Sequence, residues 1–204
     1  MDNTLIDIID DDEAVRDSLG FLLATAGFNV KCHASPQAFL EAFDPATSGC
    51  IVTDIRMPEM NGIELLRHLR ENGNLTPVIV ITGHGDVPLA VEAMKLGAID
   101  FIEKPFNEDQ IVQAVTAGVG ESRENARRDQ QRQEIVSRLA ELSGREREVL
   151  EGLVEGKPNK VIAGDLGISP RTVEIYRANV MQKMRATSLS ELVRMALLVD
   201  LSGH

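Results

Sequence analysis

The stretch IVTDIRMPEMNG (residues 51–62) joins a strand-like apolar start to a single aspartate and an irregular continuation. Ile51 and Val52 favour a buried strand that ends at Asp54, and Pro58 breaks the pattern four residues later. A buried carboxylate is costly unless it is paired with a cation or bound to a metal. Asp54 is therefore either a cap for the segment that follows or the place where the chemistry happens.

Around this stretch, up to about residue 120, strand-like segments alternate with helix-like segments. The predicted strands are TLIDIID, FNVKCH, GCIVTD, PVIVITG and IDFIEK, which begin at residues 4, 28, 49, 77 and 99. Apolar residues at helical spacing follow each strand, as Val15, Leu19 and Leu22 do after the first. This order predicts a doubly wound α/β fold whose five-stranded parallel sheet is covered by helices on both faces.

Two further segments complete the chain. Residues 121–137 (ESRENARRDQQRQEIVS) are nearly all polar, and their composition favours an exposed helix, with a flexible linker as the alternative. From residue 138 the apolar pattern is helical, in four segments, which predicts an all-α four-helix domain. Two of these helices meet at Gly167, and SPRT (residues 169–172) opens the second, as in a helix-turn-helix. The predicted parts are 1–120, 121–137 and 138–204.

The charge is distributed unevenly between these parts. The whole chain carries a net charge of −11, which by itself argues against binding to nucleic acid. Residues 1–120 hold 7 basic and 19 acidic residues, whereas residues 138–204 hold 10 and 9. The acidity therefore belongs to the first part and does not exclude DNA binding by the last. Because there is neither a signal peptide nor an apolar run of about 20 residues, we expect a cytoplasmic protein without a membrane span.

Charged and hydroxyl side chains follow the predicted strands. Asp10 and Asp11 follow the first strand, Asp54 ends the third, Thr82 ends the fourth, and Lys104 follows the fifth. In a doubly wound sheet, ligands bind at the carboxyl ends of the strands. Carboxylates that lie close together cannot all stay ionised without a cation. The sequence therefore predicts a site for a hard divalent ion, Mg²⁺ or Mn²⁺.

Asp10–Asp11, Asp54 with MPEMNG, ITGHGD with Thr82, and KPF with Lys104 together resemble the response-regulator receiver family. The resemblance covers residues 3 to about 120 and implies a flavodoxin-like sheet. It also implies that Asp54 is the phosphoacceptor, with its carboxylate attacking phosphorus. Asp11, Asp54 and the backbone carbonyl of Arg56 would hold the metal, with Asp10 acting through water.

The receiver resemblance assigns further roles. Lys104 would pair with a phosphoryl oxygen and Thr82 would donate a hydrogen bond to another. Phe101 would follow as an aromatic switch, although an aromatic residue in a strand is often only a core residue. The Lys104–Pro105 peptide bond is expected to be cis. The resemblance also implies a receiver dimer face that includes Val91, Lys95 and Phe101.

The motifs REREVL, NKVIAGDLGIS, RTVE and QKM resemble the LuxR-type DNA-binding domain, over about residues 139–200. On a helical wheel of its third helix, Val173, Val180 and Met184 face the core, and the opposite face would enter the major groove. The implied base readers are Glu174, Ile175 and Ala178. The expected phosphate contacts are Lys160, Arg171, Thr172, Tyr176 and Lys183. The alternative for each charged residue here is that it only lies on a solvent-exposed helix face and does not contact DNA.

Residues 87–95 and the stretches DFIEKPF, PNK, ISPRTVE and RANVM narrow the resemblance to nitrogen-fixation response regulators. This implies a transcriptional activator that accepts a phosphoryl group from a sensor histidine kinase, FixL-like and oxygen-sensing by resemblance. The target genes would be nitrogen-fixation or microaerobic genes. A DNA-binding domain of net charge near +1 should bind weakly alone, so phosphorylation-dependent homodimerisation is the expected control. Double-stranded promoter DNA and RNA polymerase are the expected partners.

Two other functions fit parts of the pattern. An aspartyl-phosphate hydrolase also places an aspartate at a strand end, but it needs a second aspartate two residues later, where this chain has Arg56. An architectural DNA-binding protein would not need Asp10, Asp11, Thr82 or Lys104. The sequence therefore favours a phosphoacceptor over a turnover enzyme.

Overall fold

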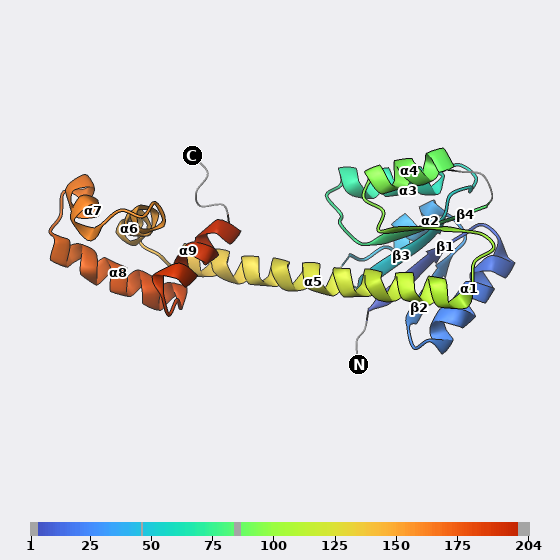
Figure 1. Ribbon diagram of the computed structural model, residues 1–204, viewed down its shortest axis with the longest axis horizontal. Coiled ribbons are helices and arrows are strands. Elements are labelled where there is room, and N and C mark those ends of the chain that lie inside the picture. The colour runs from blue at the N-terminus through green and yellow to red at the C-terminus, as the bar shows by residue number, and fades with distance from the viewer. Residues whose placement is uncertain (1–3, 46, 84–86, 200–204) are drawn as a thin grey trace. The chain divides into compact units, whose positions relative to one another are not determined.

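The computed structural model describes the chain except for residues 1–3, 46, 84–86 and 200–204 (Figure 1). The chain divides into two compact units, Met1–Asn125 and Ala126–His204. Each unit is built around cores of its own and is treated separately below.

The first unit contains the predicted parallel sheet. Its strands are β1 (Leu5–Ile9), β2 (Asn29–His33), β3 (Ser48–Asp54), β4 (Val78–Thr82) and β5 (Asp100–Glu103). They pair in the order β2-β1-β3-β4-β5, and every pairing is parallel. The predicted doubly wound sheet is therefore confirmed. The strand order reverses between β1 and β3, so a ligand site is expected where these two strands end.

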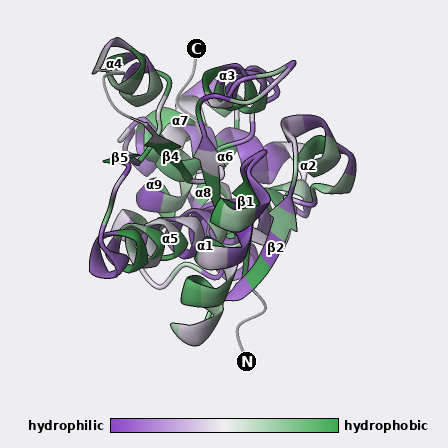
Figure 2. Ribbon diagram, turned by 90° about the vertical axis from the view of Figure 1, so that its right-hand side faces the viewer, coloured by the Kyte–Doolittle hydropathy of each residue, from purple (hydrophilic) through white to green (hydrophobic). Residues whose placement is uncertain are grey.

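Helices cover both faces of this sheet. They are α1 (Glu13–Thr25), α2 (Pro36–Ala42), α3 (Gly62–Glu71), α4 (Val87–Lys95) and α5 (Glu108–Ala140). In Figure 1, α1 and α5 lie on one face and α2, α3 and α4 on the other. Alternating side chains of a strand feed the two cores, since Ile8 belongs to the cluster with α1 and α5, and Ile9 to the other. Figure 2 shows β1 and β4 in the green of apolar residues between the helices.

Helix α5 is a single helix of 33 residues that contributes to two different cores. Ile111 and Val115, near its start, belong to a core of the first unit, whereas Ile135 and Leu139, near its end, belong to the core of the second. The predicted linker, residues 121–137, lies within this helix. Its middle residues, 126–134, are exposed.

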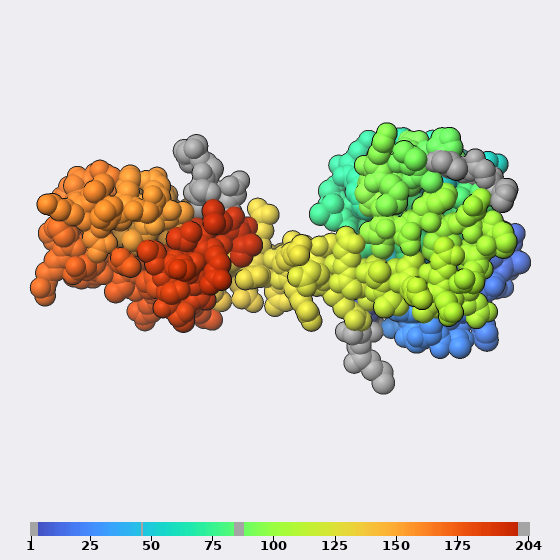
Figure 3. Space-filling view, viewed as in Figure 1, coloured from blue at the N-terminus to red at the C-terminus, as the bar shows by residue number. Residues whose placement is uncertain are grey.

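The second unit is helical, as predicted. It contains the end of α5 together with α6 (Gly144–Val154), α7 (Asn159–Leu166), α8 (Pro170–Met184) and α9 (Leu189–Leu198). Gly167 ends α7 in the left-handed conformation (φ 66°), and the side chain of Ser169 caps α8 by accepting a hydrogen bond from the backbone N–H of Thr172. The predicted helix-turn-helix is therefore confirmed. Figure 3 shows the orange residues of α8 at the surface of this unit.

Candidate functional site

Four of the predicted site residues lie at the carboxyl ends of the parallel strands. Asp10 directly follows β1 and is 3 % exposed, and Asp54 ends β3 and is 8 % exposed. Thr82 ends β4 and is buried, and its backbone carbonyl accepts a hydrogen bond of 2.7 Å from the backbone N–H of Lys104. The sheet therefore brings together two buried carboxylates, a hydroxyl and an ammonium group.

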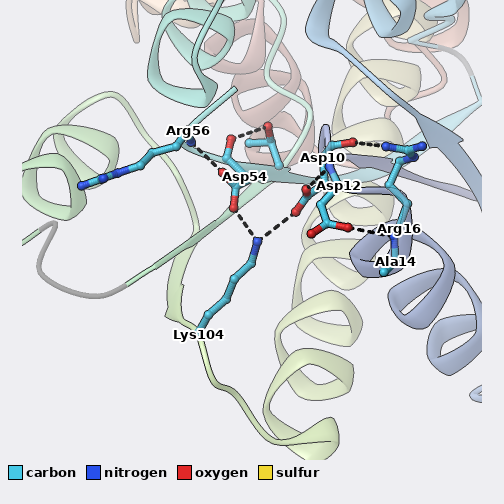
Figure 4. A network of polar contacts seen from close by, with 8 residues as sticks. Asp10, Asp12, Ala14, Arg16, Asp54, Arg56 and Lys104 are labelled. Carbon is cyan, nitrogen blue, oxygen red and sulfur yellow. Dashed lines mark hydrogen bonds and ion pairs between the residues drawn. The ribbon is translucent and has the colours of Figure 1, made fainter. Parts of the chain in front are cut away.

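Lys104 bridges the two buried carboxylates (Figure 4). Its Nζ lies 2.6 Å from Oδ1 of Asp54 and 2.9 Å from Oδ2 of Asp10. Such charge-assisted hydrogen bonds are stronger than bonds between neutral groups. Lys104 thus supplies the positive charge that two neighbouring buried carboxylates require.

The site changes the acidity of both partners in the Lys104–Asp54 pair. Burial raises the pKa of Asp54 above its usual value, against the opposing effect of Lys104 and of the Arg56 N–H. Burial alone would lower the pKa of Lys104, but its hydrogen bonds to Asp54 and Asp10 outweigh this effect and raise the pKa. The lysine is therefore firmly cationic, whereas the charge on Asp54 is held at a cost in free energy.

The loop after Asp54 is shaped around that residue. Oδ2 of Asp54 accepts a hydrogen bond of 2.6 Å from the backbone N–H of Arg56. A Cβ atom at Gly62 would lie 2.2 Å from the carbonyl oxygen of Asp54, so only glycine fits there. The side chain of Asn61, in a capping box with Glu64, caps α3. Asp54 is thus not the helix cap, and its carboxylate faces Lys104.

The predicted metal ligands are only partly brought together. Asp10 and Asp54 share Lys104, but Asp11 is exposed, and the described residues contain no group of three or more ligating side chains arranged to hold an ion. Lys104 offsets only one of the two negative charges of Asp10 and Asp54, so the pair keeps a net negative charge. The donor atoms themselves fit Mg²⁺, because carboxylate oxygens are its preferred protein ligands.

The residues of the predicted switch and dimer face are also placed. Phe101 is partly buried and packs against the core beneath α4, while Val91 and Lys95 are exposed on α4. The Lys104–Pro105 bond is cis, as predicted. Residues 84–86 of the ITGHGD motif lie outside the described residues. The roles of Phe101, Val91 and Lys95 in switching and dimerisation stay predictions.

Sequence reasoning missed two sets of polar contacts behind the site. Asp7, on β1, is buried and accepts hydrogen bonds from Nε2 of His33 (2.8 Å) and Oγ of Ser48 (2.9 Å). Arg16, on α1, donates from Nη1 to the backbone carbonyl of Asp10 over 2.7 Å. A charged residue inside an apolar strand, Asp7 in TLIDIID, was the available signal for the first set. The contact of Arg16 with a backbone atom leaves no such signal.

The second unit presents the predicted recognition face on α8. Val173, Val180 and Met184 are buried, which confirms the inward face predicted by the helical wheel. The opposite face is open to solvent, and Ile175 at its centre is 57 % exposed. Exposed with it are Arg171, Glu174 and Ala178, and on α7, Lys160; Thr172 and Tyr176 are partly buried. Their contacts with DNA stay predictions.

Lys183, a predicted phosphate contact, is engaged within the protein. Its Nζ lies 2.7 Å from Oε2 of Glu146 and 3.1 Å from the carbonyl oxygen of Glu141. The same Glu146 oxygen accepts from the backbone N–H of Ser143 in the capping box of α6. The bond from Lys183, with that from Ser143, lowers the pKa of Glu146 to about 2. Lys183 therefore has a structural contact within the second unit, and its contact with DNA stays a prediction.

None of the helices in the described part of the chain is long and apolar enough to cross a membrane.

Models of two protein families match the chain. Residues 6–116 match the response regulator receiver domain, and residues 140–196 match the luxR family of bacterial regulatory proteins.

Curated relatives align over nearly the whole chain. The transcriptional regulatory protein FixJ of Azorhizobium caulinodans is 60 % identical over 197 residues, which cover 97 % of this chain and 93 % of the relative. FixJ of Rhizobium meliloti is 54 % identical over 198 residues, which cover 97 % of each chain.

Two solved structures align with nearly the whole chain. The response regulator StyR superposes with a TM-score of 0.83 at 40 % identity, covering 95 % of this chain and 98 % of StyR. Full-length FixJ from B. japonicum superposes with a TM-score of 0.60 at 50 % identity, covering 98 % and 99 %.

Proposed function

Because this chain belongs to the two-component response regulators of the FixJ type, with a receiver domain and a LuxR-type DNA-binding domain, we propose that phosphorylation of Asp54 controls its binding to promoter DNA. It is a FixJ-like transcriptional regulator rather than a turnover enzyme. The observation that carries the proposal is the bridge from Lys104 to Asp54 and Asp10, because it provides a nucleophile and a cation at one strand end.

The phosphodonor would be a phosphohistidine of a FixL-like sensor kinase or a small acyl phosphate. A carboxylate oxygen of Asp54 attacks phosphorus, a new O–P bond forms, and the bond from phosphorus to the donor breaks with its electron pair leaving on the donor. The N–H of Arg56, 2.6 Å from Oδ2, holds the carboxylate in place during the attack. Oδ1 faces Lys104, whose ammonium then follows the negative charge onto a phosphoryl oxygen.

Receiver domains generally bind Mg²⁺, and the oxygen donors of this site fit that ion. Asp11, Asp54 and the carbonyl of Arg56 would hold Mg²⁺ or Mn²⁺, with Asp10 acting through water. When bound, the ion supplies positive charge against the transferring phosphoryl oxygens. Movement of Lys104 away from Asp10 would leave that carboxylate to face the ion instead.

Thr82 and Phe101 would transmit a conformational change from the phosphorylated Asp54 to the surface of the first unit. The hydroxyl of Thr82 would donate a hydrogen bond to a phosphoryl oxygen, and Phe101 on the neighbouring strand would turn inward after it. Thr82 lies on β4 and Phe101 lies on the adjacent strand β5, where it pairs with Val80. The altered surface, which includes Val91, Lys95 and Phe101, would pair two receiver units.

Paired regulators would bring two DNA-binding units to one promoter. Glu174, Ile175 and Ala178 would read bases, and phosphate contacts would come from Lys160, Arg171, Thr172, Tyr176 and Lys183. The bound regulator would then act on RNA polymerase at nitrogen-fixation or microaerobic genes; of these, nitrogen fixation fits the name FixJ that the relatives carry. We propose a receiver domain over residues 1–120 and a DNA-binding domain over residues 138–204, to whose core Ile135 of the segment 121–137 also contributes.

Incubation with acetyl phosphate and Mg²⁺ tests the proposal. We expect an acid-stable, base-labile acyl phosphate on Asp54 that persists for minutes, detected by mass spectrometry, together with dimerisation and tighter specific DNA binding. Rapid multiple turnover of phosphate esters would show a hydrolase instead. Unchanged DNA binding by the phosphorylated protein, or an unchanged response in Asp54→Asn, would overturn the proposal.

A further inference from the structure

Arg16 reaches from α1 back to the end of β1. Its Nη1 donates a hydrogen bond of 2.7 Å to the backbone carbonyl of Asp10, and the side chain is partly buried (Figure 4). Arg16 is also tied at its own backbone, because its N–H donates to the carbonyl of Asp12 over 3.1 Å. Arg16 therefore connects the turn of residues 10–12 to the first turn of α1 through two hydrogen bonds.

Asp10 is held at each of its four polar groups. Its N–H donates to the carbonyl of His33 (3.3 Å), its carbonyl accepts from Arg16, and its Oδ1 accepts from the backbone N–H of Asp12 (2.9 Å). Its Oδ2 accepts from Lys104. In the proposed reaction Lys104 moves to the phosphoryl group, so the bond to Oδ2 is lost at that moment. The bond from Arg16 does not depend on a reacting group and remains.

We propose that Arg16 is a positioning residue, which fixes the Asp10–Asp12 turn and thereby sets how tightly the acidic site binds Mg²⁺ and how fast Asp54 is phosphorylated. This inference rests on the proposed function. A bond from a charged donor is stronger than a bond between neutral groups, so this single contact restrains the turn effectively. Small displacements of groups around a reacting centre, or of the partners that orient metal ligands, change affinity and rate by one or two orders of magnitude.

Arg70 provides a matched control. It is also partly buried in the first unit and also donates to backbone carbonyls there: Nη1 to Asn74 (2.8 Å) and Thr76 (3.1 Å), and Nη2 to Gly97 (2.9 Å). These residues precede β4 and β5, so they lie at the edge of the sheet opposite the acidic site. Arg16→Met therefore removes one bond to a backbone carbonyl at the carboxyl ends of the strands, and Arg70→Met removes three such bonds at the opposite end of the sheet.

The experiment uses the full chain and two measurements. The first is amide hydrogen exchange of Asp12 without phosphodonor or metal, which we expect to be faster in Arg16→Met and unchanged in Arg70→Met. The second is the rate of phosphorylation by acetyl phosphate as a function of Mg²⁺ concentration. We expect the half-saturating Mg²⁺ concentration to rise by about tenfold in Arg16→Met. A loss of folded protein alone would lower the amplitude and leave this concentration unchanged.

The outcomes separate the inference from the proposed function. If the unaltered protein does not become phosphorylated, the proposed function fails, while exchange at Asp12 still reports on the turn. If the unaltered protein is phosphorylated and Arg16→Met shows the same Mg²⁺ dependence, the positioning role is wrong. Equal shifts in Arg16→Met and Arg70→Met would also overturn it. Arg16→Lys keeps a cationic donor on α1, so it should recover at least part of the Mg²⁺ dependence that Arg16→Met loses.

Discussion

The ammonium nitrogen of Lys104 lies 2.6 Å from a carboxylate oxygen of Asp54, although the two residues are 50 positions apart in the chain. The parallel sheet creates this contact, because the carboxyl ends of β3 and β5 lie on the same side of the sheet and Lys104 directly follows β5. A buried aspartate that looks costly in the sequence thus has a cation beside it. The cost is reduced but not removed, and this has a measurable consequence.

Replacing Asp54 with Asn should stabilise the first unit at neutral pH while abolishing phosphorylation. Burial raises the pKa of Asp54 in the folded state above its unfolded value, so ionisation of Asp54 favours unfolding. The stabilisation of Asp54→Asn should be present at pH 7, shrink as the pH falls through the raised pKa of the folded state, and be lost below about 4, where the carboxyl is protonated in both states. Urea unfolding at several pH values measures it. The exposed Asp17→Asn serves as control, and a lower stability of Asp54→Asn than of the unaltered protein at pH 7 would contradict this account.

Replacing Glu146 with Gln should destabilise the second unit by about 2 kcal/mol at pH 7, because a charge-assisted bond from Lys183 is lost in a buried position. The pKa of Glu146, about 2 in the folded protein, lies below its unfolded value. Its contribution is therefore complete above about pH 5 and is lost as the pH falls towards 2. Thermal unfolding across this pH range provides the measurement.

The neighbouring Glu148→Gln is the control for the Glu146 experiment. Glu148 pairs with Arg145 over 2.8 Å, but both side chains are largely exposed, so the pair should be worth less than about 0.5 kcal/mol. Equal losses in the two variants would show that burial does not distinguish these carboxylates.

Removing the carboxylate of Asp7 should cost about 3 kcal/mol of stability, since Asp7→Ala leaves Nε2 of His33 and Oγ of Ser48 buried without their acceptor. Asp7→Asn keeps the shape and one acceptor and should lose less. Denaturant unfolding of the full chain, followed by a probe of the first unit, gives both values. A loss for Asp7→Ala below about 1 kcal/mol would mean that water replaces these bonds readily.

Two lysines in the second unit should affect DNA binding differently. Lys160 is exposed at the start of α7, whereas Lys157 is paired with Glu155 (2.8 Å) and Asp165 (3.1 Å). Lys160→Ala should weaken specific and non-specific DNA binding alike. It should also reduce the slope of log affinity against log salt concentration by about one. Lys157→Ala should leave both unchanged. Affinities measured over a range of salt concentrations test this pair, and a larger effect of Lys157→Ala would place the DNA on another face.

The base-reading role of Ile175 has a distinct signature. Ile175→Ala should reduce the preference for the specific site over random DNA by about 1–3 kcal/mol, with little change in non-specific affinity. Competition binding with both DNAs gives the ratio. A uniform loss of affinity would instead assign Ile175 to packing rather than to base recognition.

The sequence was sufficient for the elements whose signals are local. The apolar runs around Ile51 and Val78 predicted the strands, and the spacing of Val173, Val180 and Met184 predicted the buried face of α8. Strand ends at Asp10, Asp54 and Lys104 also predicted which side chains meet, because topology fixes that edge of the sheet.

Contacts that depend on side-chain conformation could not be predicted in this way. Nothing in the sequence shows that Arg16 turns back to a backbone carbonyl, or that Lys183 pairs with Glu146. Nor does it show that Lys104 contacts both Asp10 and Asp54 while Asp11 faces solvent. Each of these is a choice among rotamers that the surrounding packing decides.

The sharing of α5 between two cores limits how this gene can be recombined. A hybrid that exchanges the output module within the helix would keep Val119 in the first core and Ile135 in the second only if the crossover falls between them. A fragment that begins at residue 138 would lose Ile135 and leave part of its core uncovered. Natural or laboratory shuffling of such regulators should therefore tolerate breakpoints in the polar residues 121–134 and reject those on either side.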